Sequence, residues 1–140
     1  MSIEQIISDF EFIDDWEDRY RYVIELGNKL EPLAEELKTA ESKVKGCVSQ
    51  VWLISERKPG PNGEDILHFT GDSDAHIVRG LMAIVFIIFS DKSPREIVQT
   101  DHEQIFKTLD LKDHISPQRS NGLSAMVLRI KADAEAELAK

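Results

Sequence analysis

Two stretches of helical hydrophobic spacing open the chain. Apolar residues recur at intervals of three or four between residues 3 and 13, and Ser2 with Gln5 forms a candidate capping box in front of them. The pair Asp14–Asp15 interrupts this stripe, and a second stripe runs from Trp16 to Ile24. The pattern therefore predicts two successive helices, with either aspartate of the pair as the cap of the second.

The pattern changes to an extended one in the middle of the chain. Bulky and β-branched residues from Val48 to Ile54 favour a strand, and apolar and polar residues alternate from Ile66 to Thr70. Between them, Pro59–Gly63 is a dense turn signal. We expect an antiparallel hairpin with a long exposed loop. A third strand is expected at Lys43–Lys45, ending at a break at Gly46.

The second half of the chain is predicted to be helical. A helix over residues 75–89 is apolar nearly all round and should form the buried centre of the fold, with one of the polar residues 72–74 as its cap. The dipeptides Ser93–Pro94 and Ser116–Pro117 each combine a cap with a proline at the first helical position. The second of these begins a long helix that runs to the C-terminus.

These elements predict an α+β fold: a small antiparallel sheet of about three strands with helices packed against one face. The 140 residues fit a single domain, 1–140. Acidic residues outnumber basic ones by 26 to 17, and the resulting charge of −9 disfavours nucleic acid or an anionic membrane as the main partner. The longest apolar run, Leu81–Phe89, is far shorter than the roughly 18 residues of a membrane span.

The chain contains one cysteine, which excludes an internal disulfide framework and any cysteine-rich metal site made by this chain alone. A lone cysteine suits a reducing compartment. The N-terminal segment Met1–Gln5 has neither the basic region nor the apolar region of a signal peptide. We therefore expect a cytoplasmic protein without a bound metal.

Cys47 is the first candidate for chemistry. Gly46 frees the backbone beside it, and Lys43 and Lys45 would favour the thiolate and so lower its pKa. The alternative is that Cys47 is a small buried apolar residue, which is the common environment of a free cysteine. The sequence leaves both interpretations open.

Three further features carry weaker signals. Asp72 and Asp74 could bind a cation or act as acid and base, although helix capping is the favoured explanation of both. Arg119 lies at a predicted helix start, where the helix dipole disfavours a cation, so it either has a functional anionic partner or forms a structural ion pair. Gly122 in the same helix indicates close packing.

The four histidines lack the spacing of a helical metal site and are interpreted as surface or capping residues. A Cys–His hydrolase stays open as a hypothesis, because such pairs assemble from distant parts of a sequence.

Three segments, in this order, resemble the SufE family of sulfur acceptors for cysteine desulfurases. They are Lys45–Leu53 (KGCVSQVWL), Gly71–Leu81 (GDSDAHIVRGL) and Ser116–Leu123 (SPQRSNGL), and the aromatic segment Trp16–Leu26 fits as well. Any one of them is a weak signal, but their combination covers nearly the whole chain. The resemblance implies a fold related to the IscU scaffold.

The resemblance also implies a function. Cys47 would accept persulfide sulfur from a cysteine desulfurase of the SufS type, stimulate that enzyme and pass the sulfur to an iron–sulfur scaffold complex of the SufBCD type. The chain would thus be a persulfide carrier rather than a stand-alone enzyme. It would bind no cofactor itself, since the pyridoxal phosphate belongs to the desulfurase. The expected supporting or partner-binding residues are Gly46, Ser49, Gln50, Asp74 and Arg119.

One position departs from the family pattern, because Val48 stands where the motif has Gln. Any polar role of that side chain is therefore absent here. An alternative function is a non-catalytic regulatory module that binds a desulfurase or another partner, with Cys47 structural. The sequence leaves the oligomeric state open, a homodimer included.

Overall fold

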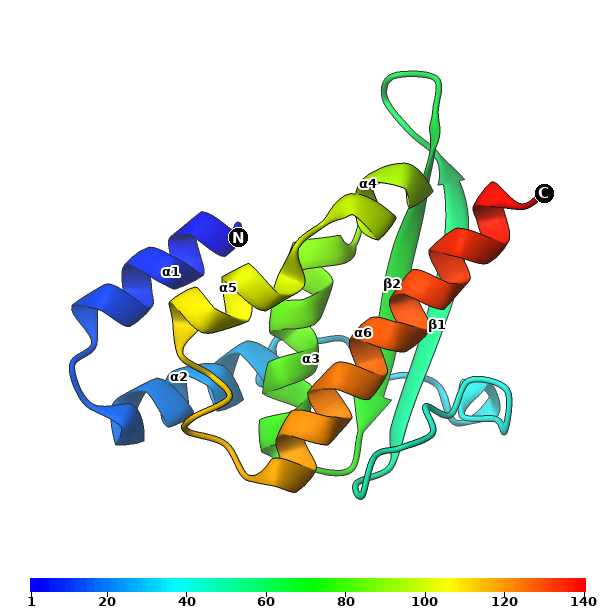
Figure 1. Cartoon of the computed structure of the whole chain (residues 1–140). Helices are drawn as coiled ribbons and strands as arrows, with labels where there is room; N and C mark the ends of the chain where they lie inside the picture. Colours follow the sequence, from blue (N-terminus) through cyan, green and yellow to red (C-terminus); the bar gives the residue numbers. More distant parts are fainter.

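A long β-hairpin and six α-helices make up the computed structural model, which describes residues 1–140 (Figure 1). In chain order the elements are α1 (Ile3–Phe12), α2 (Trp16–Asn28), the 3₁₀ turn η1 (Glu35–Leu37), β1 (Val51–Pro59), β2 (Asp65–Ser73), α3 (His76–Phe89), α4 (Pro94–Gln99), α5 (His102–Leu109) and α6 (Pro117–Leu138). The predicted α+β class is confirmed.

The sheet contains two strands, so the expectation of about three is wrong. β1 and β2 pair antiparallel from Val51 opposite Ser73 at one end to Pro59 opposite Asp65 at the other. The segment predicted as a third strand makes only an isolated bridge, between Lys43 and Trp52. Its pairing cannot continue because the chain turns away at Gly46, whose φ of +92° is a conformation that favours glycine.

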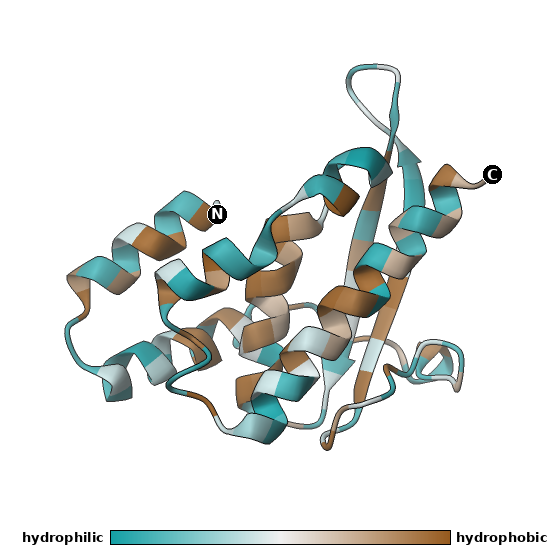
Figure 2. Cartoon of the chain, viewed as in Figure 1, coloured by the Kyte–Doolittle hydropathy of each residue, from teal (hydrophilic) through white to brown (hydrophobic).

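α3 is the centre of the core, as its all-round apolar sequence predicts (Figure 2). α2 packs along one side of it, while α6 and β2 pack on other sides (Figure 1). The inward face of the hairpin contributes Val51, Leu53, Leu67 and Phe69, all buried in the same core. The helices therefore cover one face of the hairpin. No helix is both long enough and apolar enough to cross a membrane.

The predicted cap of α3 is wrong. The cap position is Ala75, which has no side-chain hydrogen bond to offer, and Ser73 Oγ accepts a bond only from the backbone N–H of Ala75, at 3.3 Å. Asp72 and Asp74 both bond to other parts of the chain. The local sequence favours capping by these aspartates, but both carboxylates instead bind groups that are distant in the sequence.

The other predicted caps are present. Asp15 accepts from the backbone of α2, and Ser116 accepts from the first turn of α6. Ser93 forms a complete capping box at the start of α4. At α1 only half of the predicted box forms: Ser2 accepts from the N–H of Gln5, whose own side chain bonds to Asp9 instead.

α2 and α3 approach so closely that their backbones are in contact. A Cβ atom added at Gly80 would lie 2.1 Å from the carbonyl oxygen of Val23, and one added at Gly27 would lie 2.5 Å from the nitrogen of Gly80. The obstructing atoms belong to backbone, which cannot rotate aside as a side chain would. The two glycines therefore set the distance between these helices.

Replacing Gly80 with Ala should destabilise the protein by about 2–4 kcal/mol, because the added methyl group forces two helices apart within the core. The free energy of unfolding is measured by urea denaturation. Glu25→Ala, on the exposed side of α2, is the matched control and should change it by less than about 0.5 kcal/mol. An equally small effect of Gly80→Ala would contradict the close approach.

Candidate functional site

Cys47 lies in the loop before β1, with its side chain turned toward the start of α6. Its thiol is half-buried and lies 3.7 Å from the carbonyl oxygen of Gly122, to which the S–H is a weak donor. A Cβ atom at Gly122 would lie 3.6 Å from Sγ. The close packing predicted at Gly122 is therefore its contact with the cysteine.

The thiol faces a pocket of about 390 Å³ between its own loop, α3 and α6. Its walls are mainly apolar and include Val51, Val78, Leu81, Leu123 and Met126. Ser49, Ser116, Gln118 and Arg119 are the polar side chains along it, and Arg119 is the only ionisable lining residue besides Cys47 itself. The pocket has room for an additional sulfur atom on Cys47.

The prediction that neighbouring lysines lower the pKa of Cys47 is wrong. Burial raises the pKa of this thiol above its ordinary value. Lys43 and Lys45 are exposed to solvent, where water and salt screen their charge. Since the thiolate is the nucleophile, burial lowers the fraction of Cys47 that is in the reactive form at neutral pH in this conformation.

Two backbone constraints hold the cysteine loop. Gly46 makes the turn before Cys47 with its positive φ. After the cysteine, Asp74 Oδ1 accepts the N–H of Gln50 at 3.0 Å, and the N–H of Asp74 donates to the carbonyl of Gln50 at 3.3 Å. Asp74 thus clamps the end of the loop to the end of β2.

Asp72 has a structural role and lies in a cluster of ion pairs. Its carboxylate lies 3.1 Å from Arg79 Nε and 3.7 Å from Lys38 Nζ, and it accepts the backbone N–H of Leu33 at 3.2 Å. The predicted alternatives of a paired acid and base or a shared cation do not hold, because Asp72 and Asp74 bond to different partners. This ion-pair cluster fastens the segment that follows α2 to the hairpin and α3.

Arg119 does not form the structural ion pair that was one of its two predicted roles, and the other, a functional anionic partner, stays a prediction. Its Nη1 donates to the hydroxyl of Tyr20 at 2.6 Å, and its guanidinium lies 5.8 Å from the centre of the same ring. Sequence reasoning assigned Tyr20 only to the apolar stripe of α2. No local signal in the sequence links a tyrosine of the second helix to an arginine of the last one.

The histidines do not form a catalytic pair with the cysteine, because no histidine lines its pocket. His102 is part-buried between Phe89 and Phe106, which contradicts its interpretation as a surface residue, and burial lowers its pKa. His114 stacks on Trp16. The geometry therefore does not support a Cys–His hydrolase.

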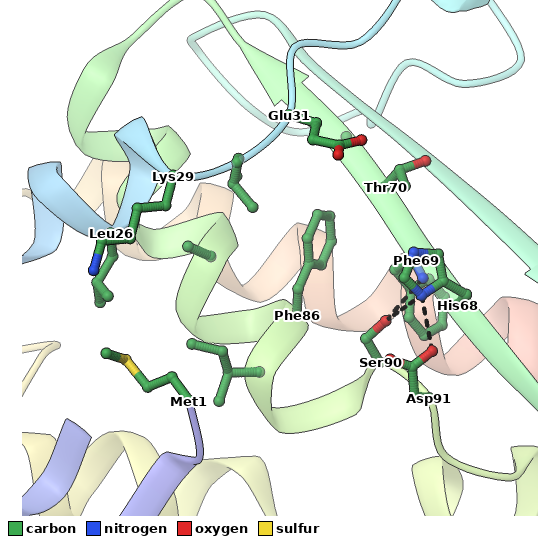
Figure 3. Close-up of a pocket in the computed structure, with 14 residues that line it drawn as sticks. Met1, Leu26, Lys29, Glu31, His68, Phe69, Thr70, Phe86, Ser90 and Asp91 are labelled. Carbon is green, nitrogen blue, oxygen red and sulfur yellow. Dashed lines mark hydrogen bonds and ion pairs between the residues drawn. The ribbon is translucent and has the colours of Figure 1, made fainter. Parts of the chain in front are cut away.

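The largest cavity, about 750 Å³, lies elsewhere, between α2, β2 and α3 (Figure 3). His68 is drawn there beside Ser90 and Asp91 (Figure 3). Its Nδ1 lies 2.8 Å from Asp91 Oδ1 and 3.4 Å from Ser90 Oγ. A serine triad needs the serine and the aspartate on opposite ring nitrogens, so these three residues do not form one.

A groove of about 680 Å³ lies on the other side of the cysteine loop. Lys43, Lys45 and Arg129 line it, and Glu41 is its only acidic residue. Leu128 lines it with a side chain that is 70% exposed, and Val48, in the cysteine loop, is 78% exposed. The surface around Cys47 is therefore basic and partly apolar, although the protein as a whole is acidic.

Residues 4–134 match the family described as SufE, an Fe-S metabolism associated domain. The chain belongs to the SufE family. Membership assigns the protein to iron–sulfur metabolism and agrees with the three segments that carried the resemblance.

Individual proteins agree with this family assignment. The chain is 53% identical to an uncharacterized SufE-like protein of Rhizobium meliloti over 137 residues, covering 98% of this chain and 97% of that one. It is 54% identical to a SufE-like protein of Rhizobium etli over 138 residues, or 99% and 93% of the two chains. The solution structure of a hypothetical protein from Thermus thermophilus has the same fold, with a TM-score of 0.77 at 17% identity over both full chains.

In this SufE-family chain the six predicted site residues gather around one loop and its pocket. Cys47, Ser49 and Arg119 line the pocket, while Gly46, Gln50 and Asp74 shape the loop. Segments far apart in the sequence thus meet at one thiol.

The thiol of Cys47 should titrate above the value of about 8.5 that is usual for a cysteine, because burial opposes the thiolate. The rate of iodoacetamide alkylation, measured from pH 6 to 10, gives the midpoint. The same chain unfolded in urea is the control and should react faster at pH 7. A midpoint below about 8.5 in the folded protein would show that nearby cations outweigh burial.

Proposed function

We propose that this protein is a sulfur carrier that takes persulfide sulfur from a cysteine desulfurase onto Cys47 and delivers it to iron–sulfur cluster assembly. The observation that carries the proposal is the placement of the single cysteine. In a SufE-family chain it lies on a loop against an apolar pocket with space for one more sulfur, without a histidine in that pocket.

The reaction is thiol–persulfide exchange. The Cys47 thiolate attacks the outer sulfur of the donor persulfide, forming a new S–S bond as the donor's S–S bond breaks. The electron pair leaves with the desulfurase thiolate, which can take up the proton that Cys47 lost. No external oxidant or reductant is needed, and the exchange between similar thiols is close to thermoneutral.

The resting geometry shelters the thiol, so sulfur transfer requires the loop to open. The constraints at Gly46 and Asp74 hold Cys47 against α6 in the free protein. Such shelter limits oxidation and transfer to the wrong acceptor. It also makes docking of the partner a conformational step.

The groove beside the loop is the proposed docking surface for the desulfurase. Its lysines complement an acidic partner surface, whereas Arg129 is paired with Asp133, and the exposed Leu128 and Val48 add apolar contact. Val48 replaces the expected Gln at a position that faces solvent, so its effect falls on partner contact rather than on the fold.

The carrier itself holds no cofactor in this proposal; pyridoxal phosphate acts in the desulfurase. No three His, Cys, Asp or Glu side chains come together as a set of metal ligands. We therefore propose that cluster assembly occurs on a separate scaffold complex, in the reducing cytoplasm.

Purified protein incubated with a cysteine desulfurase and L-cysteine should gain the mass of one sulfur atom by intact mass spectrometry. Treatment with a reductant should remove the added sulfur, since a persulfide is reducible. Cys47→Ser is the matched control and should gain none. Absence of a mass gain with several desulfurases, in a folded protein whose thiol can be alkylated, would contradict the carrier function.

The alternative is a regulatory module in which Cys47 is structural. The fold and the proposed docking surface would be sufficient for such a module. It predicts that Cys47→Ser still stimulates the desulfurase fully in the presence of excess L-cysteine. Loss of stimulation together with loss of the mass gain favours the carrier.

Arg119→Ala should slow sulfur transfer to Cys47 by about tenfold while the protein remains folded, because the pocket loses its only cation near the reacting sulfur. The initial rate of persulfide formation is followed by quenched-flow mass spectrometry, and circular dichroism checks the fold. Lys92→Ala, a change away from the pocket, is the control. An unchanged rate would exclude a role for Arg119.

A further inference from the structure

Like Arg19, which donates to the backbone carbonyls of Phe10 and Ile13, Arg119 has no carboxylate partner in this chain. It is half-buried, and no carboxylate lies within ion-pair distance; its one polar side-chain bond goes to the neutral hydroxyl of Tyr20. Carboxylate partners are present for Arg21, Arg57, Arg79, Arg95 and Arg129. In a protein with a net charge of −9, this leaves a cation without an anion at the wall of the cysteine pocket.

The direction of the guanidinium is set by α2. Trp16 on this helix stacks on His114, with ring centres 3.9 Å apart and planes 8° from parallel. One turn later, Tyr20 holds Arg119 through its hydroxyl and its ring face. Trp16 thus contacts the segment that leads into α6, and Tyr20 contacts the first turn of α6.

Arg119 shares the pocket with Cys47 but does not activate it in this conformation. Gln118 and the two serines of the lining are neutral, and Lys43 and Lys45 face the groove on the other side of the loop. Asp74 bonds to the backbone of Gln50 and does not line the pocket. Burial is the cause of the raised pKa of Cys47, and no neighbouring cation counteracts it.

We infer that Tyr20 is a positioning residue that holds the Arg119 guanidinium off Cys47 in the free protein and yields it to the Cys47 thiolate when a partner opens the loop. The second half of this inference rests on the sulfur-carrier function proposed above. The first half concerns the isolated protein alone.

The physical basis is competition between two acceptors for one cation. While the cysteine is protonated, the tyrosine hydroxyl and ring are the better partners of the guanidinium. A thiolate is an anion, so it is the better partner of the guanidinium once the hydrogen bond to Tyr20 is absent, whether movement of the loop or a substitution removes that bond. An opposite charge within about 4–6 Å lowers a pKa by one unit or more, which means about ten times more thiolate at neutral pH.

The test is the pH profile of iodoacetamide alkylation of Tyr20→Phe, which removes the hydroxyl and keeps the ring. Its alkylation midpoint should fall, with a rate at pH 7 severalfold above that of the unaltered protein. Tyr22→Phe is the matched control on the same helix; that hydroxyl bonds to Asp9, and the variant should behave as the unaltered protein. In the double variant Tyr20→Phe/Arg119→Gln, both the fall in the alkylation midpoint and the faster rate at pH 7 should disappear.

The single variant Arg119→Gln supplies a second measurement that does not depend on Tyr20→Phe being folded. It should leave the alkylation midpoint unchanged, because Arg119 does not stabilise the thiolate at rest. A raised midpoint in Arg119→Gln would overturn the inference, as would an unchanged or raised midpoint in folded Tyr20→Phe. A fall that persists in the double variant would also overturn it.

These assays contain no desulfurase, so their outcome is independent of the proposed function. If Tyr20→Phe shows the Arg119-dependent fall and Cys47 still accepts no sulfur, the carrier function fails while the pairing of Tyr20 and Arg119 stands. If sulfur is accepted but the midpoint does not move, only the inference fails.

Discussion

The backbone contact between α2 and α3 at Gly27 and Gly80 is the constraint on which the functional region depends. α3 is buried on nearly all sides, so it forms a rigid reference for the elements around it. Direct backbone contact fixes the position of α2 more tightly than interdigitated side chains would. That position brings Trp16 and Tyr20 within reach of His114 and Arg119, nearly a hundred residues later in the chain.

The cysteine site is assembled from two independently supported parts. The loop is shaped by Gly46 and tied down by Asp74, both belonging to the hairpin side of the molecule. The opposing wall belongs to α6, where Gly122 leaves space for the sulfur. At the thiol itself the two parts are joined by a weak contact, while Arg129 of α6 donates to the carbonyls of Glu41 and Lys43 earlier in the same segment. Movement of the loop can therefore be confined to the residues around Cys47 and leave the core undisturbed.

Local signals in the sequence were sufficient for the hairpin, the buried helix α3 and most helix caps. They failed where a tertiary partner competed with a local one. Asp72 and Asp74 have the composition of a cap, yet Arg79 and the backbone of Gln50 engage them. Likewise, the pairing of Tyr20 with Arg119 depends on the helix packing, which spacing along one helix does not reveal. The family motifs located the site, whereas its electrostatics required the fold.

The charged residues next to Cys47 in the sequence are not the ones that matter most for its thiol in the folded protein, and burial explains the difference. Lys43 and Lys45 are the sequence neighbours, but their side chains are solvated and screened. Arg119 is half-buried beside the apolar pocket, where the same unit of charge interacts more strongly. In the structure as it stands, burial alone sets the pKa of this thiol. In the proposed open state of the loop, Arg119 of α6 is the cation placed to stabilise the thiolate, and the packing of α2 determines where its guanidinium points.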